Sequence, residues 1–319
     1  MRPFCERAPH RAGRPAKEFQ LNIEKSQVLN RFELLDQIGE GSQGQLYIGR
    51  DTNDDSLVAV KLQRPRTFES TRTFGEVGEE LEKEAETAQA LAGIQGVPER
   101  IASGVFKGRY GDQRCFVMEL VNGTPLYDVL MEFRPVPLMS AVAITGQLCE
   151  ILDRVHEKGW LHCDVKPENV MLEPDGSVRI LDLGLAGRIG ERPDWPKGSP
   201  GYAPPEQYEK GALTETADIF ALGCLLLEMT VMHLPYAGTL ARPGTDWPVL
   251  PPDRLRLVPP EIRSLVLRMV DLEPLNRPAR MREVFAGLRP LLPPAGQKPP
   301  DKRMSPDPTA YYRAGRATL

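Results

Sequence analysis

The sequence predicts an α+β fold built from two unequal units, a small β-rich unit followed by a larger helical unit. Two observations carry this prediction. Strand-like apolar runs occupy the start of the compact region, within residues 31–62. Hydrophobic residues at helical spacing then dominate residues 138–158, 217–232 and 260–271. A chain of 319 residues is long enough to bury the core that such a two-part domain requires.

The prolines mark the ends of the compact region. The chain holds 31 of them, nearly twice the usual share of about 5%. They are dense near the N-terminus and again from Pro290 onward, where charged residues and glycine separate them. Such composition favours extended or disordered segments. The sequence therefore predicts a flexible tail over 1–30, a compact domain over 31–289 and an extended or disordered proline-rich tail over 290–319.

Charge and hydropathy exclude several classes of function. The net charge is −4, so no global basic field attracts nucleic acid. No run approaches the roughly 18 apolar residues of a membrane helix, and the N-terminus has no apolar signal region. The five cysteines are scattered and form no CxxC pair, which argues against a disulfide framework or a zinc site. We therefore expect a reducing, cytoplasmic location, no membrane segment and no nucleic-acid partner.

A glycine cluster separates the first two predicted strands, 31–38 and 44–49. Gly39, Gly41 and Gly44 form a G-x-G-x-x-G pattern. A dinucleotide fingerprint would require a helix after the glycines, whereas a strand-like run follows here. A glycine loop between antiparallel strands can fold over phosphates, because no Cβ blocks the approach of the backbone. Taken alone, the cluster is equally consistent with an ordinary hairpin.

A lysine ends the next predicted strand, 57–62. Lys61 lies on an otherwise apolar strand and needs a partner there, unless it snorkels from a sheet edge. An amphipathic helix follows over 79–91, and Glu84 borders its apolar face. We predict that Glu84 pairs with Lys61, with Glu80 as the second candidate.

Polar residues gather around a later hairpin. Asp164, Lys166 and Asn169 stand in one short loop, directly before a hairpin over 170–181 with an Asp-Gly turn. Asp182 ends that hairpin and so returns near Asn169. Carboxylate and amide oxygens suit Mg²⁺, which shares its coordination with phosphate. Each element alone reads as a turn residue, a strand cap or a surface ion pair, but their joint order favours one phosphate-handling site.

The motifs in their order resemble the protein kinase family, in its eukaryotic-like (Hanks-type) serine/threonine branch, and their spelling resembles bacterial members. They are the glycine cluster, VAVK ending at Lys61, HCDVKPEN over 162–169, DLG over 182–184, GSPGYAPPEQ over 198–207 and LNRP over 275–278. The resemblance covers about residues 32–289. It implies a bilobal protein-kinase-like fold with a small antiparallel β-rich N-lobe (31–118), a hinge (119–123) and a larger helical C-lobe (124–289).

The resemblance also implies an ATP site. Its residues would be Ile38, Gly39, Gly41, Gly44, Leu46, Ala59, Lys61, Glu84, Met118, Glu119 and Val121. The three glycines would cover the phosphates, and Lys61 would bind them while paired with Glu84. Ile38, Leu46 and Ala59 would enclose the adenine. Met118 would be the gatekeeper, and the predicted strand 115–121 would end in the hinge that hydrogen-bonds the adenine.

The same resemblance implies the catalytic roles. Asp164 would orient the substrate hydroxyl and accept its proton, and Lys166 would steady the γ-phosphate. Asn169 and Asp182 would hold Mg²⁺, with Mn²⁺ as an alternative ion. Ser199 would help to seat the substrate, although it also reads as a polar turn residue.

Three further residues are implied to be structural. Glu206 and Arg277 would form a buried ion pair. Asp218, at the start of a helix, would anchor the catalytic loop, or else serve only as an acid at a helix N-terminus.

The partners would be proteins with Ser or Thr hydroxyls, and the proline-rich tails could dock other partners.

Three residues depart from the family pattern: Leu183 and Pro204 replace the usual phenylalanine and alanine without removing a catalytic group, and Cys163 bears on regulation. Cys163 replaces the arginine that usually precedes the catalytic aspartate and pairs with a phosphate on the activation loop. The loop from Asp182 to Glu206 holds no threonine, and its only hydroxyls are Ser199 and Tyr202. The hypothesis is a serine/threonine kinase that is active without activation-loop phosphorylation. The alternatives are a pseudokinase scaffold that binds nucleotide and a kinase of small molecules.

Overall fold

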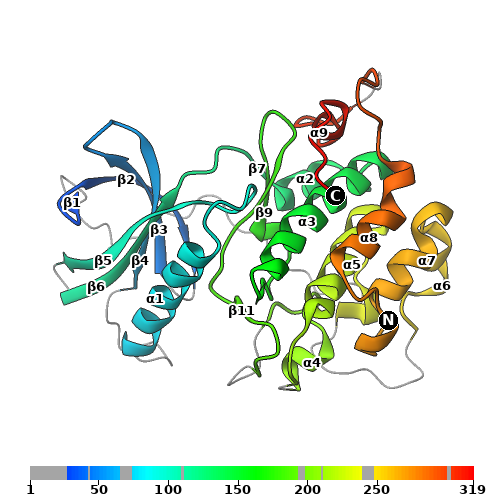
Figure 1. Ribbon diagram of the computed structural model, residues 1–319, viewed down its shortest axis with the longest axis horizontal. Helices are drawn as coiled ribbons and strands as arrows, with labels where there is room; N and C mark the ends of the chain where they lie inside the picture. The colour runs from blue at the N-terminus through cyan, green and yellow to red at the C-terminus, as the bar shows by residue number, and fades with distance from the viewer. Residues whose placement is uncertain are drawn as a thin grey trace.

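The N-terminal part of the molecule is an antiparallel sheet with one helix packed on it (Figure 1). The computed structural model describes residues 27–41, 44–64, 74–108, 111–192, 198–209, 211–238, 248–299 and 303–319. The sheet has the order β1-β2-β3-β4-β6-β5. Its strands are β1 (Gln27–Val28), β2 (Phe32–Glu40), β3 (Gly44–Asp51), β4 (Leu57–Gln63), β5 (Arg100–Gly108) and β6 (Gly111–Glu119). The helix is α1 (Phe74–Ala90).

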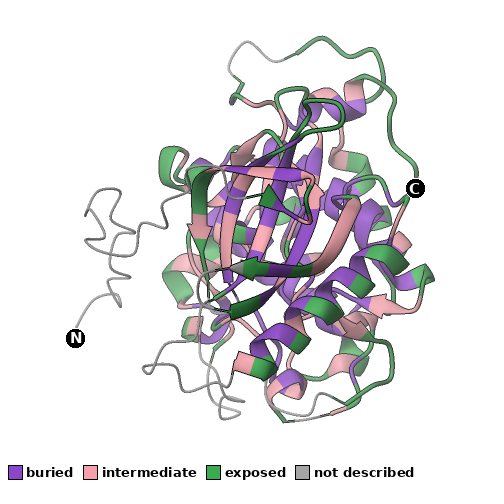
Figure 2. Ribbon diagram, turned by 90° about the vertical axis from the view of Figure 1, so that its left-hand side faces the viewer, coloured by how far each residue is buried: buried purple, intermediate pink, exposed green. Residues whose placement is uncertain are grey.

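Helices dominate the C-terminal part. They are α2 (Leu126–Glu132), α3 (Leu138–Glu157), α4 (Pro205–Tyr208), α5 (Glu215–Val231), α6 (Pro252–Leu257), α7 (Pro260–Met269), α8 (Met281–Leu288) and α9 (Thr309–Arg313). Figure 2 shows how much of the chain in the sheet and helices is buried. Buried residues lie on every side of α3 and α5, so both helices run through the core. Within the described residues, no helix combines the length and the hydropathy needed to cross a membrane.

Two small strand groups lie between the sheet and the main helices. Strands β7 (Thr124–Pro125), β9 (Val170–Leu172) and β10 (Val178–Ile180) form one sheet in the order β10-β9-β7. Strand β8 (Trp160–Leu161) pairs with β11 (Gly187–Arg188). The predicted hairpin is therefore β9–β10, with its turn at Asp175 and Gly176, where Gly176 has a φ of +86°. This hairpin positions the site because Asn169 precedes it and Asp182 follows it.

The predicted α+β bilobal fold is confirmed. The helices predicted over 138–158, 217–232 and 260–271 correspond to α3, α5 and α7. The domain bounds 31–289 and the division into lobes stay predictions. Of the predicted N-terminal tail, residues 1–26 lie outside the described residues, and the last residues, from 27, already belong to the sheet through β1.

The expectation of an extended or disordered C-terminal tail is wrong for residues 303–319, which we call the C-terminal strap. Met304, Tyr311 and Tyr312 are buried there, and α9 packs on α3. Figure 1 shows α9 beside α3 at the top of the helical part. Burial of two aromatic rings favours the packed state over the extended one that proline content alone suggests.

Candidate active site

An ion pair joins the sheet, helix α1 and the end of the β9–β10 hairpin. The Lys61 ammonium on β4 lies 2.6 Å from Glu84 Oε2 on α1 and 3.4 Å from Asp182 Oδ1. The Glu84 side chain is buried, whereas that of Asp182 is 44% exposed. Glu84 therefore fills the position predicted for the partner of Lys61.

Electrostatics keep both Lys61 and Asp182 charged. Burial opposes the charge of Lys61, but Glu84 and Asp182 outweigh it and raise the pKa of the ammonium above its ordinary value. Burial also opposes the Asp182 carboxylate, yet Lys61 and the backbone amide of Gly184 lower its pKa below the ordinary value. A cation and a carboxylate thus face the same space at neutral pH.

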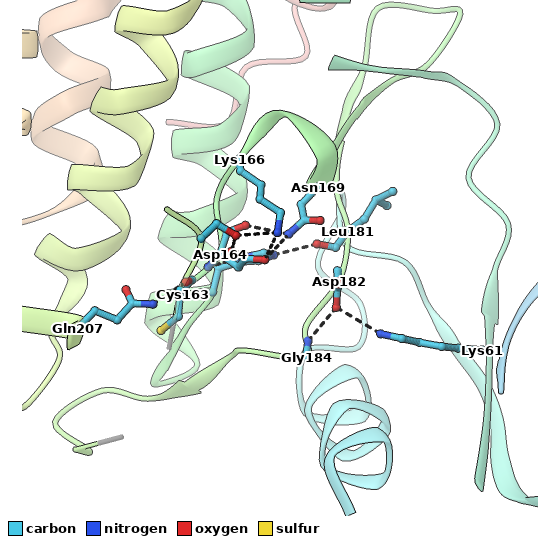
Figure 3. A network of polar contacts seen from close by, with 12 residues as sticks. Lys61, Cys163, Asp164, Lys166, Asn169, Leu181, Asp182, Gly184 and Gln207 are labelled. Carbon is cyan, nitrogen blue, oxygen red and sulfur yellow. Dashed lines mark hydrogen bonds and ion pairs between the residues drawn. The ribbon is translucent and has the colours of Figure 1, made fainter. Parts of the chain in front are cut away.

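The Asp164 carboxylate forms a closed hydrogen-bond triangle with Lys166 and Ser199, and Figure 3 shows Lys166 and Asn169 beside it. Lys166 Nζ donates to Asp164 Oδ2 at 2.7 Å and to Ser199 Oγ at 2.8 Å. The Ser199 hydroxyl in turn donates to Asp164 Oδ1 at 2.6 Å. Asn169 Nδ2 adds a 2.9 Å bond to Asp164 Oδ2. The structure therefore brings Asp164, Lys166, Asn169 and Ser199 together, with a protein hydroxyl already in contact with the carboxylate.

Asp218 holds the loop that carries Asp164. From the first turn of α5, its buried carboxylate accepts the backbone N–H groups of His162 at 2.9 Å and Cys163 at 2.8 Å. His156 Nε2 lies 2.8 Å from the same carboxylate. Cys163 has a φ of +62°, a left-handed conformation that is costly for any residue except glycine. The two bonds from Asp218 and Gln207 to this backbone compensate for that cost.

Two oxygen donors face the site where a divalent cation would fit. The amide N–H₂ group of Asn169 donates hydrogen bonds to the backbone carbonyl and the carboxylate of Asp164. The amide oxygen of Asn169 accepts no hydrogen bond from any described residue. The Asp182 carboxylate is the second donor. Among the described residues, no three His, Cys, Asp or Glu side chains gather to hold a metal by themselves. These donors fit a Mg²⁺ ion that completes its shell with phosphate and water oxygens, as Mg²⁺ commonly does.

The three glycines of the loop differ in their surroundings. A Cβ on Gly44 would lie 2.1 Å from the carbonyl oxygen of Leu62, so close strand packing requires glycine there. A Cβ on Gly41 would meet nothing within 4 Å. The Gly41 amide donates to the Gly44 carbonyl at 2.8 Å, which closes the turn between β2 and β3. Of these two glycines, Gly41 is thus the one with open space beside it, and its role toward phosphate stays a prediction.

The predicted adenine-binding residues come from four neighbouring strands. Ala59 on β4 is the register partner of Met118 on β6, and Leu46 on β3 is the partner of Lys61. Ile38 on β2 is 49% exposed. Glu119 ends β6, and Val121 follows in the segment that leads to the helices. Their assignment to ATP stays a prediction.

A buried ion pair supports the segment after Ser199. Arg277 Nη1 lies 2.6 Å from Glu206 Oε1, and Arg277 Nη2 lies 3.1 Å from Glu206 Oε2. The Arg277 side chain is fully buried. Its guanidinium also donates to the carbonyl oxygens of Thr216 at 3.0 Å and Asp271 at 2.7 Å. The pair therefore links α4 to α5 and to the loop before α8.

The position of Cys163 is apolar. Cys163 is buried and packs with Leu161 and Leu213 in a small separate cluster, with Leu185 against it. The two hydroxyls of the neighbouring loop are both engaged, since Ser199 bonds Asp164 and the buried Tyr202 donates to Glu228. Residues 193–197 of this loop lie outside the described residues.

Two contacts at the site escaped the sequence reasoning. Arg179 on β10 forms a bidentate pair with Glu119, and His156 on α3 bonds Asp218. A charged residue within the apolar run Val178–Ile180 was the available signal for Arg179. His156 offered no comparable signal, because its partner lies 62 residues away.

Comparison with known proteins agrees with this geometry. The sequence pattern of the protein kinase domain matches residues 32–285. A probable serine/threonine-protein kinase of Clostridium perfringens is 28% identical over 269 residues, which cover 81% of this chain and 38% of the relative. PknB of Mycobacterium leprae is 27% identical over 272 residues (81% and 42%), and pkn3 of Myxococcus xanthus is 30% identical over 273 residues (79% and 48%).

The chain spans less than half the length of these relatives, all of which are named as serine/threonine-protein kinases. The matched kinase domain takes up most of this chain and includes every residue of the site described above. The motif order, the bilobal fold and this match agree, and the chain belongs to the protein kinase family.

Proposed function

We propose that this chain transfers the γ-phosphoryl group of ATP to serine and threonine hydroxyls of proteins. The observation that carries the proposal is the Asp164 carboxylate, which lies 2.7 Å from the Lys166 ammonium and accepts a 2.6 Å hydrogen bond from the Ser199 hydroxyl. A carboxylate that already orients one hydroxyl beside a cation is suited to orient a second, incoming hydroxyl.

The residues of the site divide the work. Asp164 orients the substrate hydroxyl and accepts its proton as the new O–P bond forms and the bond to ADP breaks. Lys166 and Lys61 bring positive charge to the phosphate oxygens, and Glu84 fixes the position of Lys61. Mg²⁺, or Mn²⁺ in its place, would be held by Asn169 and Asp182 and would neutralise phosphate charge. Ser199 fixes the side chains of Asp164 and Lys166 relative to the segment that seats the substrate.

Activity without activation-loop phosphorylation is the finer part of the proposal. It is supported by the apolar cluster around Cys163, which offers no cation for a phosphate, and by the engagement of Ser199 and Tyr202 within the protein. Protein treated with phosphatase should therefore retain its rate of phosphate transfer. Loss of activity after phosphatase, restored by phosphorylation of residues 182–206 alone, would contradict this part.

The proposed activity is tested with radiolabelled ATP and a generic basic protein as acceptor, followed by analysis of the phosphorylated amino acids. Label on serine and threonine supports the proposal. Nucleotide binding without transfer would favour a pseudokinase scaffold, and transfer only to small molecules would favour a small-molecule kinase. The contacts of Asp164 with Lys166 and Ser199 support the protein kinase over these two alternatives.

The surroundings of the reaction are also proposals. We place it in the cytoplasm, because it consumes ATP and because the four cysteines in the described residues are buried and form no disulfide with one another. The partners would be protein substrates with Ser or Thr hydroxyls. Any partner that docks on the tails would bind residues outside the C-terminal strap, because the strap is packed against the rest of the protein.

A further inference from the structure

Glu119, at the end of β6, is held in place by its neighbour in space. Its backbone N–H donates to the Glu99 carbonyl at 2.9 Å. A second hydrogen bond joins the same two residues, in which Glu119 Oε2 accepts the Glu99 N–H at 3.2 Å. Glu119 is the first residue of the proposed hinge, so its backbone and side chain together fix where that hinge begins.

Arg179 on β10, in the helical part of the molecule, forms an ion pair with the Glu119 carboxylate. Its Nη1 lies 3.0 Å from Glu119 Oε1, and its Nη2 lies 2.5 Å from Glu119 Oε2. The planar guanidinium thus meets the planar carboxylate with two parallel bonds, the arrangement that gives arginine pairs their geometric specificity. The Arg179 side chain is 13% exposed, so water screens the contact less than on an open surface. Burial opposes the charge on Glu119, but Arg179 lowers the pKa of the carboxyl below its ordinary value.

Strand β10 leads directly to Asp182, which is proposed to bind Mg²⁺. Asp182 follows Arg179 by three residues. The two residues between Arg179 and Asp182 are both held by backbone hydrogen bonds. Ile180 N–H donates to the Gly96 carbonyl at 2.8 Å, and Leu181 N–H donates to the Asn169 carbonyl at 2.7 Å. The position of Arg179 relative to Asp182 is therefore set by backbone hydrogen bonds.

We propose that Arg179 is a positioning residue for ATP, which holds the hinge at a fixed distance from Asp182. The inference rests on the proposed function. One nucleotide must place its adenine at the hinge and its phosphates near Asp182 at the same time. The Arg179–Glu119 pair joins these two ends directly, whereas the covalent path between them runs through more than sixty residues. Glu173, 3.6 Å from Arg179 Nη1, gives the guanidinium a second, weaker anchor.

The test compares Arg179→Met with Arg179→Lys and with Arg50→Met as the matched control. Arg50 lies on β3, and its Nε is 3.5 Å from Oδ1 of the exposed Asp55. It has no contact with the hinge among those found. For Arg179→Met we expect a KM for ATP, and a Kd for ADP by calorimetry, raised roughly tenfold, with kcat at saturating ATP nearly unchanged. Arg179→Lys should lie between, because the charge remains and the bidentate geometry is lost.

A charge-reversed pair separates positioning from mere folding. Glu119→Arg and Arg179→Glu should each weaken ADP binding, and the double variant should recover part of the affinity. Unchanged ADP affinity in Arg179→Met, or a loss that appears equally in Arg50→Met, overturns the inference. Loss of thermal stability without a change in ADP affinity overturns it too. If the unaltered protein transfers no phosphate, the proposed function fails, while the ADP titrations still decide the role of Arg179.

Discussion

Single buried residues set the geometry of the catalytic loop, and His156 is the clearest titratable example. Its Nε2 lies 2.8 Å from the buried Asp218 carboxylate. Burial would lower the pKa of the imidazole, but the hydrogen bond and charge of Asp218, with the charge of Glu215 3.7 Å from Nδ1, outweigh it and raise the pKa to about 9. Since the ordinary value is 6.5, the folded protein binds a proton there more tightly than the unfolded chain does.

The stabilisation from His156 should therefore depend on pH. It is fully present below pH 6.5 and is lost as pH rises through about 9, by about 3 kcal/mol in the free energy of unfolding. Urea unfolding at a series of pH values measures this. His156→Gln should flatten the decline across that window, whereas His233→Gln, at a histidine without a contact to Asp218, should leave it. Equal slopes in the two variants would refute the assignment.

The Glu206–Arg277 pair allows a second prediction at the residue scale. Removing one partner leaves a buried charge without compensation. We expect Arg277→Met to lower the free energy of unfolding by about 3–5 kcal/mol. The exposed Arg268 on α7 provides the control, and Arg268→Met should change stability by less than about 0.5 kcal/mol. Similar values for both variants would show that the pair contributes little.

At the scale of elements, the C-terminal strap is docked by one carboxylate and two glycines. The buried Glu150 on α3 accepts hydrogen bonds from the hydroxyls of Tyr311 at 3.2 Å and Tyr312 at 3.1 Å, and from Thr318 N–H at 2.8 Å. A Cβ on Gly146 would lie 2.5 Å from the Tyr312 hydroxyl. A Cβ on Gly176 would lie 2.2 Å from the backbone oxygen of Asp307 in the strap.

This packing predicts an unusual sign for Gly146→Ala. In a helix interior the change ordinarily stabilises, by about 0.5–1 kcal/mol. Here the added methyl meets the Tyr312 hydroxyl, so we expect a loss of about 1–3 kcal/mol. In a Tyr312→Phe background, which lacks that hydroxyl, the same change should cost less. Gly187→Ala, where a Cβ meets nothing within 4 Å, is the control. Stabilisation by Gly146→Ala alone would mean that the strap is not docked.

Local signals predicted some elements and missed others for physical reasons. The Asp175-Gly176 turn between two apolar runs predicted the β9–β10 hairpin, because such a turn depends on local sequence. Strand β5 was not predicted, since Gly104 within it reads as a breaker. A Cβ there would lie 2.8 Å from a side-chain methyl of Leu29, so a distant residue explains the glycine. The strap was misread likewise, because its partner Glu150 lies more than 160 residues earlier.

At the scale of the whole molecule, polar contacts between distant described residues join the sheet and α1 to the helical part. Lys61 contacts Asp182, Arg179 contacts Glu119, and Lys158 Nζ donates to the carbonyl oxygens of Ala90 and Ala92. Figure 1 shows the two parts side by side. The motif order in the sequence predicted that Lys61, Asp164 and Asp182 act together. The charge of Arg179 within an apolar run signalled that it needs a partner, but nothing in the sequence indicated that the partner is Glu119, 60 residues away.

The proposed phosphate transfer depends on the Asp164 carboxylate. The most direct test is kcat of Asp164→Asn against Asp253→Asn, a matched change at an exposed aspartate on α6. The amide keeps the size of the carboxylate but cannot accept the proton, so we predict a fall of roughly 10²–10⁴-fold in kcat with ADP affinity retained. Asp253→Asn should match the unaltered protein. Equal phosphate transfer by both variants would contradict the claim.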